Sequence, residues 1–464
     1  MSPLPCARVR DAVAGEPFCV DAALDLVSVC RELSRRGLTE ALVRDGARLG
    51  LFTGADLRDA LLRAEPPSRL AVGEVACFAP VGVQADSALF GTLGLMQRHR
   101  VRHLVVRDGD RVLGVLGQAD LAGFMARHSP LAAPQIDAAD SLAALRSATA
   151  HVDDTVASLH DAGIKVERIA GWVSELNARL FARLWALLAP ADLVANSCLL
   201  VMGSEGRGEQ IVKTDQDNAL LLRDGFECAD LQAVAGRFND ALAGLGWPPC
   251  PGGIMLINPL WRQPLAGFRE SLLDWVHGHD PEGPMRLAIF IDAAPVAGDA
   301  RLLHDAHAHL DRILVDSDAF LARFAAAADR FDEPGPWWGR LIARRDDQPL
   351  DLKKLGIFPI VHGLRALALQ HGLHATASAE RARLLAEGRH LDADLARDAV
   401  DALHALTALR LGDQLRQRRE GLAPGNLVRP SALATLERNQ LLGALAIVKR
   451  LREFLRSHFR LDSL

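Results

Sequence analysis

Apolar and polar positions follow two different spacings along this chain, and the change from one to the other outlines its parts. In the first 130 residues, pairs of short apolar runs flank an Asp-Gly, which is typical of two strands joined by a hairpin turn. Helical stretches accompany them, such as the one that places Leu26, Cys30 and Leu33 on one face. Helical spacing then dominates residues 141–188 and returns from Ile357 to the last residues. The pattern predicts a strand-rich N-terminal part, a mixed central part and a helical C-terminal part.

The N-terminal part contains an internal repeat. The segment Glu40–Leu62 resembles Arg102–Met125, and Val-Arg-Asp-Gly recurs at 43–46 and 106–109. A helical stretch precedes each copy and a second helix follows each hairpin. We therefore expect two copies of one unit, in which a hairpin lies between two helices.

Two such units in tandem resemble a CBS pair, the Bateman-type regulatory module, over about residues 15–130. In that family, a hydroxyl after the second hairpin strand meets a phosphate, and an Asp three residues on meets a ribose. Thr53 and Asp56 match in the first copy, whereas the second keeps Asp120 but has Gly117 in place of the hydroxyl. The resemblance implies one adenine-nucleotide site, and such pairs commonly form homodimers. The alternative is that Asp56 and Asp120 only cap the helices that follow them.

The segment Val201–Leu222, with the sequence VMGSEGRGEQIVKTDQDNALLL, carries the main candidate chemistry. The apolar run before it predicts a buried strand that ends in a tight turn at Gly203, where a missing Cβ lets the backbone approach a ligand. The letters SEGRGEQI predict a short helix whose N–H groups suit a phosphate, with Arg207 as a positive charge beside it.

The same segment continues with TDQDNALLL, which predicts a second strand on which Asp215 and Asp217 share one face. Two close carboxylates repel each other unless a proton or a cation intervenes. Oxygen ligands of this kind suit magnesium together with substrate phosphates. The chemistry that this predicts is a two-metal, in-line displacement at a phosphorus atom.

This order of strand, Gly-Ser, spacer and Asp-x-Asp resembles the nucleotidyltransferase superfamily that includes DNA polymerase β. The longer string GSEGRGE…TDQDNALL looks like the nucleotidyltransferase domain of PII-protein uridylyltransferases and their CBS-linked relatives. The resemblance implies that Gly203 and Ser204 hold the triphosphate tail. It also implies that Asp215 and Asp217 are catalytic and hold Mg²⁺ or Mn²⁺. Three further positions belong to the signature as nucleotide-binding candidates: Arg207, Glu209 and Thr214.

The superfamily places a third carboxylate on a later strand, where it helps to activate the nucleophile. The expected strand, Cys250–Trp261, contains no acid. The next segment contains Asp292 and Asp299, but it resembles a stretch that follows the catalytic strands in uridylyltransferases, so Asp292 is expected to be structural. The base is then Asp217, a metal-bound hydroxide or the substrate itself, or the site binds nucleotide without turning it over.

The C-terminal part resembles the region that follows the nucleotidyltransferase domain in the same family. Lys353 and Lys354 are expected just before a helix, where they either meet phosphate or an acidic acceptor, or remain solvated. Pro359 suits the first turn of that helix, because no intrahelical bond uses its missing N–H. No HExxH spacing and no HD-type phosphohydrolase domain is visible in the sequence.

These segments predict an α+β multidomain protein. We expect a CBS pair at 1–130, a linker and helices at 131–190 (the linker at Arg127–Asp140), a polymerase β-like nucleotidyltransferase domain with a mixed sheet at 191–325, and an all-α, substrate-binding-like domain at 326–464. A second break is expected at Arg330–Lys354.

Composition narrows the function classes. A net charge of −5 argues against a general nucleic-acid binder, and against RNA tailing. No apolar run approaches the roughly 20 residues of a membrane span. The seven cysteines form no CxxC pair, which suits reduced thiols in a cytoplasm. The chain has no tyrosine, so chemistry at a Tyr hydroxyl is excluded.

The preferred hypothesis is a magnesium-dependent transferase that moves UMP or AMP from a nucleoside triphosphate to an acceptor, which the resemblance suggests is a protein. Adenine nucleotide at the CBS pair would then regulate it. The alternative is a non-catalytic, nucleotide-sensing signal transduction protein with a degenerate transferase domain. A small-molecule transferase of the antibiotic-modifying type is a third hypothesis, which the CBS pair and the large helical domain disfavour.

Overall fold

The computed structural model describes residues 8–13, 17–63, 65–87, 89, 91–99, 101–117, 120–121, 132–150, 152–161, 163–278, 280–315, 317–329, 349–422 and 424–463. The chain divides into two compact units. The first comprises Met1–Leu131 and Asp154–Ile164, and the second comprises Ala132–Asp153 and Lys165–Leu464. Most of the break expected at Arg330–Lys354, and positions 127–131 of the expected linker, lie outside the described residues.

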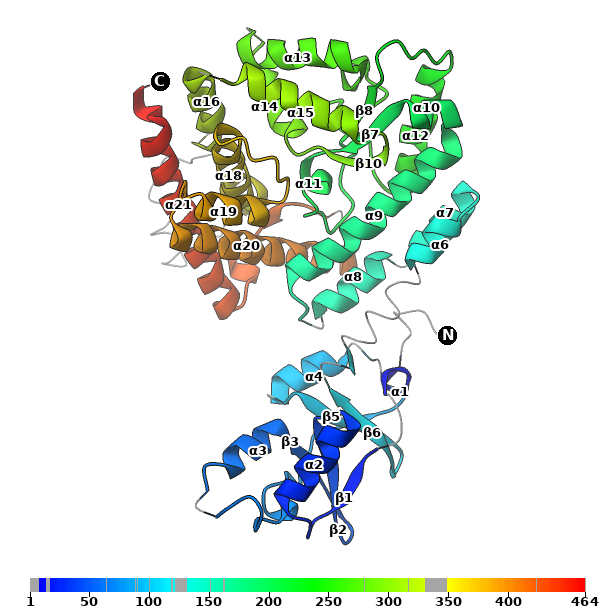
Figure 1. The fold of residues 1–464 in the computed structure, drawn as a ribbon, viewed down its shortest axis with the longest axis vertical. Helices are drawn as coiled ribbons and strands as arrows, with labels where there is room; N and C mark the ends of the chain where they lie inside the picture. Colours follow the sequence, from blue (N-terminus) through cyan, green and yellow to red (C-terminus); the bar gives the residue numbers. More distant parts are fainter. Residues whose placement is uncertain are drawn as a thin grey trace. The chain divides into compact units, whose positions relative to one another are not determined.

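The first unit contains two three-stranded sheets of the same design (Figure 1). In each, the first strand is parallel to the second, and the second is antiparallel to the third. The strands are β1 (Cys19–Asp21), β2 (Glu40–Asp45), β3 (Arg48–Thr53), β4 (Gly82–Gln84), β5 (His103–Asp108) and β6 (Arg111–Gly117). The helices of this unit are α1 (Val9–Ala12), α2 (Leu26–Arg36), α3 (Gly54–Ala60), α4 (Gly91–His99) and most of α8 (Val152–Asp161).

The repeated hairpins are confirmed, because β2 pairs with β3 and β5 pairs with β6. Gly46 and Gly109 both adopt a positive φ in the two turns, +58° and +60°, a conformation that glycine takes without steric cost. The helix expected after the first hairpin is α3, and only Asp120 and Leu121 of the second such helix lie within the described residues.

A mixed four-stranded sheet forms the centre of the second unit, in the order β10-β7-β8-β9. Its strands are β7 (Ser197–Val201), β8 (Asn218–Leu222), β9 (Arg262–Pro264) and β10 (Ala294–Gly298). β7 is antiparallel to both of its neighbours, and β8 is parallel to β9. Every residue of β7 and β8 is buried, which explains why both read as continuous apolar runs in the sequence.

Alternate side chains of these strands enter two cores. Leu200 and Leu221 pack on one face, whereas Leu199 and Leu220 pack on the other. Figure 1 shows α9 and α12 on one side of the sheet and α13, α14 and α15 on the other. The helices around the sheet are α6 (Ala132–Ala138), α7 (Leu142–Thr149), α9 (Val166–Leu188), α10 (Ala191–Ala195), α11 (Gly203–Gly206), α12 (Leu231–Gly244), α13 (Leu265–His277), α14 (Gly283–Phe290) and α15 (Arg301–Ile313).

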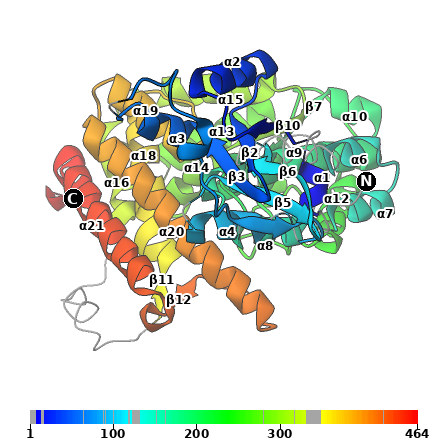
Figure 2. The same cartoon turned by 90° about the horizontal axis from the view of Figure 1, so that it is seen from below.

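The C-terminal region is helical, as predicted. Figures 1 and 2 both show α20 and α21 side by side. The elements are α16 (Asp318–Ala325), a π-helical turn (Lys353–Ile357), α18 (Phe358–Gln370), α19 (Ser378–Glu387), α20 (Ala393–Arg419), α21 (Thr435–Phe459) and the short pair β11 (Leu350–Asp351) and β12 (Leu427–Val428). Fully buried residues of these helices extend the core that begins on the α13–α15 face of the sheet.

Three local predictions differ from the structure. Positions 132–138 of the expected linker form α6, because Pro134 lies in its first turn and Ile136 is fully buried. The strand expected within Cys250–Trp261 is replaced by turns, and the strand that pairs with β8 is β9. Lys353 and Lys354 lie inside the π-helical turn rather than before a helix.

Candidate active site

The turn after β7 brings two parts of the signature into contact. Gly203 has φ +59°, and a Cβ there would lie 2.6 Å from Oδ2 of Asp217. The backbone N–H of Met202 donates to the carbonyl of Asp217 at 2.9 Å, so the ladder between β7 and β8 continues up to the turn. Ser204 follows at the start of α11, and its hydroxyl contacts Oε1 of Gln210 at 2.7 Å. Only glycine fits at position 203, because any side chain would displace the carboxylate.

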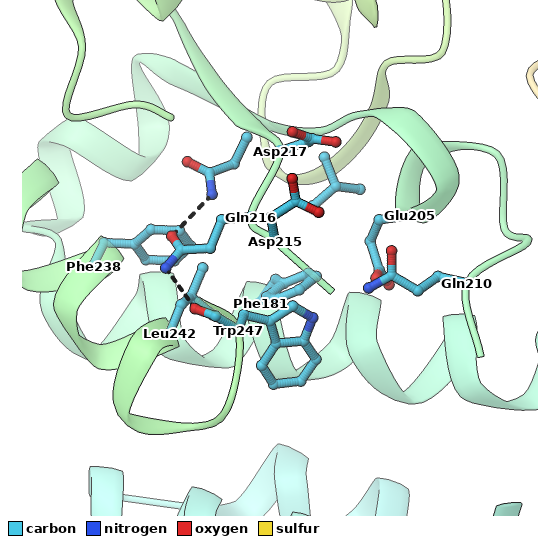
Figure 3. A pocket seen from close by; sticks show the side chains of 11 residues that line it. Phe181, Glu205, Gln210, Asp215, Gln216, Asp217, Phe238, Leu242 and Trp247 are labelled. Carbon is cyan, nitrogen blue, oxygen red and sulfur yellow. Dashed lines mark hydrogen bonds between the residues drawn. The ribbon is translucent and has the colours of Figure 1, made fainter. Parts of the chain in front are cut away.

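Asp215 and Asp217 lie just before β8, which begins at Asn218, whereas the sequence predicted them on the strand itself. Their side chains still alternate with that of Gln216. The amide of Gln216 donates to the carbonyls of Asn239 and Trp247, at 3.0 and 2.9 Å. Figure 3 shows this amide on one side of the segment and both carboxylates on the other. The alternation therefore brings the two carboxylates together without a regular strand.

A third donor group lies beside this pair. Single ligand atoms of Asp215, Asp217 and Cys250 are all within 4.8 Å of one another. Cys250 belongs to the loop between α12 and β9, and it is buried. Two carboxylates fit the oxygen preference of Mg²⁺ or Mn²⁺. The sulfur of Cys250 is a softer donor that suits zinc and related metals, so the set fits a divalent cation.

The electrostatics of this group also favour a cation. Burial, and after it the neighbouring charge of Asp215, raise the pKa of Asp217 to about 6, although a hydrogen bond with Cys250 and the charge of Lys353 act in the opposite direction. Burial also raises the pKa of the Cys250 thiol to about 11. Within the described part of the chain, neither aspartate forms an ion pair.

Glu205 is a further acid that the sequence analysis missed. It lines a small cavity together with Asp215 and Asp217 (Figure 3). Burial raises its pKa to about 8, and among the described residues its Oε2 atom has no hydrogen-bond partner. It lies within the motif Gly-Ser-Glu-Gly-Arg, where an acid between two glycines gives no signal that it is buried. Glu205 is therefore a neutral carboxyl group at neutral pH, next to the aspartates.

Cys250 was missed for a different reason. The family resemblance predicts a carboxylate, and not a thiol, in the segment that contains it. The sequence Pro-Pro-Cys-Pro-Gly-Gly around it does contain a signal, since prolines and glycines on both sides of a cysteine predict a tight loop that holds the thiol in place.

Arg207 and Glu209 make structural contacts in this conformation. Nε of Arg207 donates to Oε2 of Glu209 at 2.7 Å, and Nη1 donates to Oδ2 of Asp292 at 2.6 Å. Oε1 of Glu209 accepts a hydrogen bond from the backbone N–H of Ser378 at 2.8 Å, at the start of α19. The hydroxyl of Thr214 donates to Oε1 of Gln210 at 3.2 Å. These three signature residues hold the loop between β7 and β8 and fasten it to the helical region.

Asp292 is the centre of an arginine cluster. It is fully buried and forms ion pairs with Arg207, Arg365 and Arg381. Burial raises the pKa of this carboxyl group, but the arginines, Arg365 foremost, lower it more, so the net direction is downward. Its carbonyl oxygen would lie 1.9 Å from a Cβ at position 206, which only glycine avoids. Asp292 therefore has the structural role that the sequence predicted.

Asp299 is also engaged in ion pairs. Its carboxylate lies 2.7 Å from Nη2 of Arg223 and 2.8 Å from Nε of Arg301. Its hydrogen bond with Arg301 is the main reason why its pKa falls to about 2. Neither candidate for a third carboxylate is thus available to a metal without losing its present partners.

The two lysines have different surroundings. Lys353 is exposed, and its charge acts on Asp217. Lys354 is also exposed, and its Nζ lies 3.9 Å from the carboxylate of Asp351. The structure therefore brings Lys353 towards the aspartate pair and places Lys354 against Asp351.

In the first unit, two of the three predicted nucleotide ligands line a cavity of about 640 Å³, and Asp120 is not among its lining residues. Thr53 and Asp56 are among its lining residues, and residues from both repeats contribute to its wall. Oδ2 of Asp56 accepts hydrogen bonds from the backbone N–H and the hydroxyl of Thr53, both at 2.7 Å. Oδ2 of Asp120 accepts one from the N–H of Gly117 at 2.8 Å. Asp56 lies in the first turn of α3 and forms a capping box with Thr53, and Asp120 makes the equivalent contact with Gly117. Asp56 also lines a cavity within the roughly 300–1,000 Å³ of small-molecule sites.

Three family models match the chain. Residues 150–282 match "Putative nucleotidyltransferase DUF294", residues 318–459 match "Putative nucleotidyltransferase substrate binding domain", and residues 72–127 match "CBS domain". The chain therefore combines a CBS domain with two domains of the DUF294 nucleotidyltransferase type. The predicted α+β multidomain architecture is confirmed by this order.

Comparison with solved structures finds CBS proteins. "A putative signal-transduction protein with CBS domains" from Burkholderia ambifaria MC40-6 is 22% identical, covers 25% of this chain and 88% of its own, and has a TM-score of 0.23. A CBS domain protein from Pyrobaculum aerophilum, solved with AMP, is 20% identical, covers 26% and 98%, and has a TM-score of 0.24. No curated protein matched the chain. No helix within the described ranges is long and apolar enough to cross a membrane.

Proposed function

We propose that this protein is a metal-dependent nucleotidyltransferase that moves UMP or AMP from a nucleoside triphosphate to an acceptor group on a protein. The observation that carries the proposal is the contact between the Gly203 turn and the Asp215–Asp217 pair. A phosphate-binding turn and a cation-binding pair of carboxylates are the two parts that displacement at phosphorus requires. The Gly203–Ser204 turn and the aspartates come from adjacent strands, so packing of the sheet holds them in place.

In the proposed reaction, a nucleophile on the acceptor attacks the α-phosphorus of the triphosphate. The bond from that phosphorus to the bridging oxygen breaks, pyrophosphate leaves, and the acceptor loses a proton. Asp215 and Asp217 would hold Mg²⁺ or Mn²⁺, and Cys250 would be a third donor for a softer metal such as Zn²⁺. The bound cation would neutralise charge on the phosphates. Ser204 and Lys353 would orient the phosphates, because the first follows the turn and the second acts on Asp217.

The test uses the intact protein, each of four labelled nucleoside triphosphates, Mg²⁺ or Mn²⁺, and cell extract. Mass spectrometry then identifies any protein that gains a nucleotide. The double variant Asp215→Asn/Asp217→Asn is the control, because it keeps the shape of both side chains and removes both charges. Label on an acceptor with the wild type alone supports the proposal, and the same pattern with both proteins contradicts it.

We also propose that an adenine nucleotide binds the CBS cavity and regulates transfer. The cavity size and the position of Asp56 on its wall support this. Calorimetry with AMP and ATP tests it, with Asp56→Asn as the variant, because an amide oxygen still accepts the hydrogen bond from the N–H of Thr53. Weaker binding in the variant is expected. An absence of heat with the wild type would rule out this site.

The alternative of a non-catalytic nucleotide sensor has one observation in its favour. Asp292 and Asp299 are both committed to arginines, so neither acts as a third carboxylate. A sensor would bind nucleoside triphosphate at the Gly203 turn and label no acceptor under any of the conditions above. Binding without transfer would therefore decide between the two functions.

A further inference from the structure

A second cavity opens on the other side of the Gly203 turn, between the turn and α20. Ser204, Arg207 and Gly208 line it from the turn, and His404, Thr407 and Arg410 line it from α20. Its volume is about 160 Å³, smaller than the roughly 300–1,000 Å³ of sites that hold a complete small molecule. The cavity therefore suits part of a ligand. Two guanidinium groups and two hydroxyl groups line it, together with the carboxylates of Glu167 and Glu209, and Glu209 is paired with Arg207.

Arg410 is the distinctive residue of this cavity. It is partly buried, and it forms no hydrogen bond or ion pair with any residue that the structure describes. Burial lowers its pKa, and so does the nearby charge of Arg207, whereas the charge of Asp351 acts in the opposite direction. An arginine side chain stays protonated in proteins, so this group remains a cation without an ion-pair partner among the described residues. A partly buried, unmatched charge is costly unless a ligand supplies the opposite charge.

The surrounding charges do not supply that counter-ion. Arg207, Arg365 and Arg381 share two carboxylates, those of Asp292 and Glu209. Adding Arg410 gives four guanidinium groups against two carboxylates, an excess of two positive charges. Two other acids lie nearby, and each already has a basic neighbour: Asp351 contacts Lys354, and Glu167 lies 3.9 Å from Lys165 and 4.0 Å from His404.

We propose that this cavity binds the terminal phosphates of the nucleoside triphosphate, with Arg410 as a direct phosphate ligand. The inference rests on the proposed function and deepens it, because it names the part of the substrate that the helical region recognises. Ser204 lines the cavity and also follows the turn that contacts Asp217, so a phosphate chain can run from the aspartates into the cavity. Arg410 on α20 would then favour a nucleoside triphosphate over a monophosphate, because only the triphosphate reaches it.

The experiment measures inorganic pyrophosphate binding to the intact protein by calorimetry, in the presence of a chelator. Pyrophosphate is the leaving group for every donor base, and it lacks the adenine that the CBS cavity would recognise. Arg410→Ala should weaken binding at least tenfold, and Arg410→Lys should restore part of the loss. Arg397→Ala is the matched control on the same helix, because Arg397 is exposed and pairs with Asp394, and it should bind as the wild type does.

Competition between pyrophosphate and nucleotides shows whether the anion and the triphosphate bind at the same site. Pyrophosphate should displace UTP, and UMP should compete weakly for the same site. Binding of pyrophosphate that leaves UTP bound would show a separate anion site and overturn the inference, as would equal affinity in wild type and Arg410→Ala. Thermal unfolding of each variant shows whether it is folded. If Arg410→Ala is unfolded, Arg410→Lys and Arg410→Gln provide the same comparison.

Failure of this inference can be told apart from failure of the proposed function. Asp215→Asn/Asp217→Asn should keep pyrophosphate binding in chelator while losing transfer. If the wild type transfers nucleotide and Arg410→Ala has an unchanged KM for the triphosphate, the cavity assignment alone is wrong. If pyrophosphate binds through Arg410 and no acceptor is ever labelled, the cavity assignment stands and the transferase proposal is wrong.

Discussion

Two groups of carboxylates in the second unit have opposite surroundings. Asp215 and Asp217 lie side by side, and crowding and burial raise the pKa of Asp217 to about 6. Asp292 is surrounded by three arginines that lower its pKa. The first group lacks a cation and the second already has three. The comparison teaches that an acid near the sheet is a candidate metal ligand only where the fold leaves its charge unmatched.

The largest effect is expected when the charge of Asp217, which has no ion-pair partner among the described residues, is removed. Asp217→Asn should lower the rate of nucleotide transfer by about a thousandfold, because a catalytic metal stabilises the transition state by several kcal/mol and each 1.36 kcal/mol is a factor of ten. The measurement is the initial rate of labelled nucleotide incorporation at saturating metal. A rate within threefold of wild type would show that this pair is not the metal site.

The second test removes the charge of Asp292, which is paired with three arginines. Asp292→Asn leaves three arginines without their shared carboxylate, which should destabilise the protein by about 3–5 kcal/mol. Denaturant unfolding followed by fluorescence measures the change. Asp398→Asn is the control, because its pair with Arg450 is largely exposed and should contribute about 1 kcal/mol or less. Equal loss in the two variants would mean that the arginine cluster is not a structural centre.

The third test asks which metal the unmatched pair prefers. With Cys250 as the third donor, the site should bind Co²⁺ with a sulfur-to-metal absorption band, and Cys250→Ser should remove that band. The variant should also lose about ten- to a hundredfold in Zn²⁺ affinity while its Mg²⁺ affinity changes little, because thiolate favours softer metals. A Co²⁺ spectrum identical in both proteins would leave the cysteine as a hydrogen-bond donor to Asp217.

The last test concerns Glu205, whose pKa is raised from 4.5 to about 8. Between these values the folded protein holds a proton that the unfolded chain has lost, so stability should fall as pH rises through this window, by up to about 1.4 kcal/mol per pH unit. Glu205→Gln should remove that part of the slope. Thermal unfolding midpoints from pH 5 to pH 8 measure it, and parallel curves for the two proteins would contradict the assignment.

The sequence predicted the local parts of this fold well. Short apolar runs on either side of an Asp-Gly turn were sufficient to predict the repeated hairpins. The helical spacing of apolar positions was sufficient to predict α9 and α18. The contact between Gly203 and Asp217 follows from the same local pattern, since both flank adjacent strands. The spacing of apolar residues reflects the repeat of the local backbone, about 3.6 residues in a helix and two in a strand. It can therefore be recognised without knowing how the helices pack. Pro or Gly interrupts the periodicity in three of the misplaced segments, whereas Asp215 and Asp217 were misplaced only because β8 begins at Asn218.

Proximity between distant segments was decided by tertiary structure alone. Arg365 and Arg381 lie 73 and 89 positions from Asp292, and no pattern near Asp292 indicates that they would enclose it. Cys250 reaches the aspartates through a loop, and Arg410 faces Ser204 across a cavity from another helix. The sequence by itself determined which residues are candidate cation ligands and where the chain turns. Packing of the helical region against the sheet decided which acids were neutralised by arginine and which were left for a ligand.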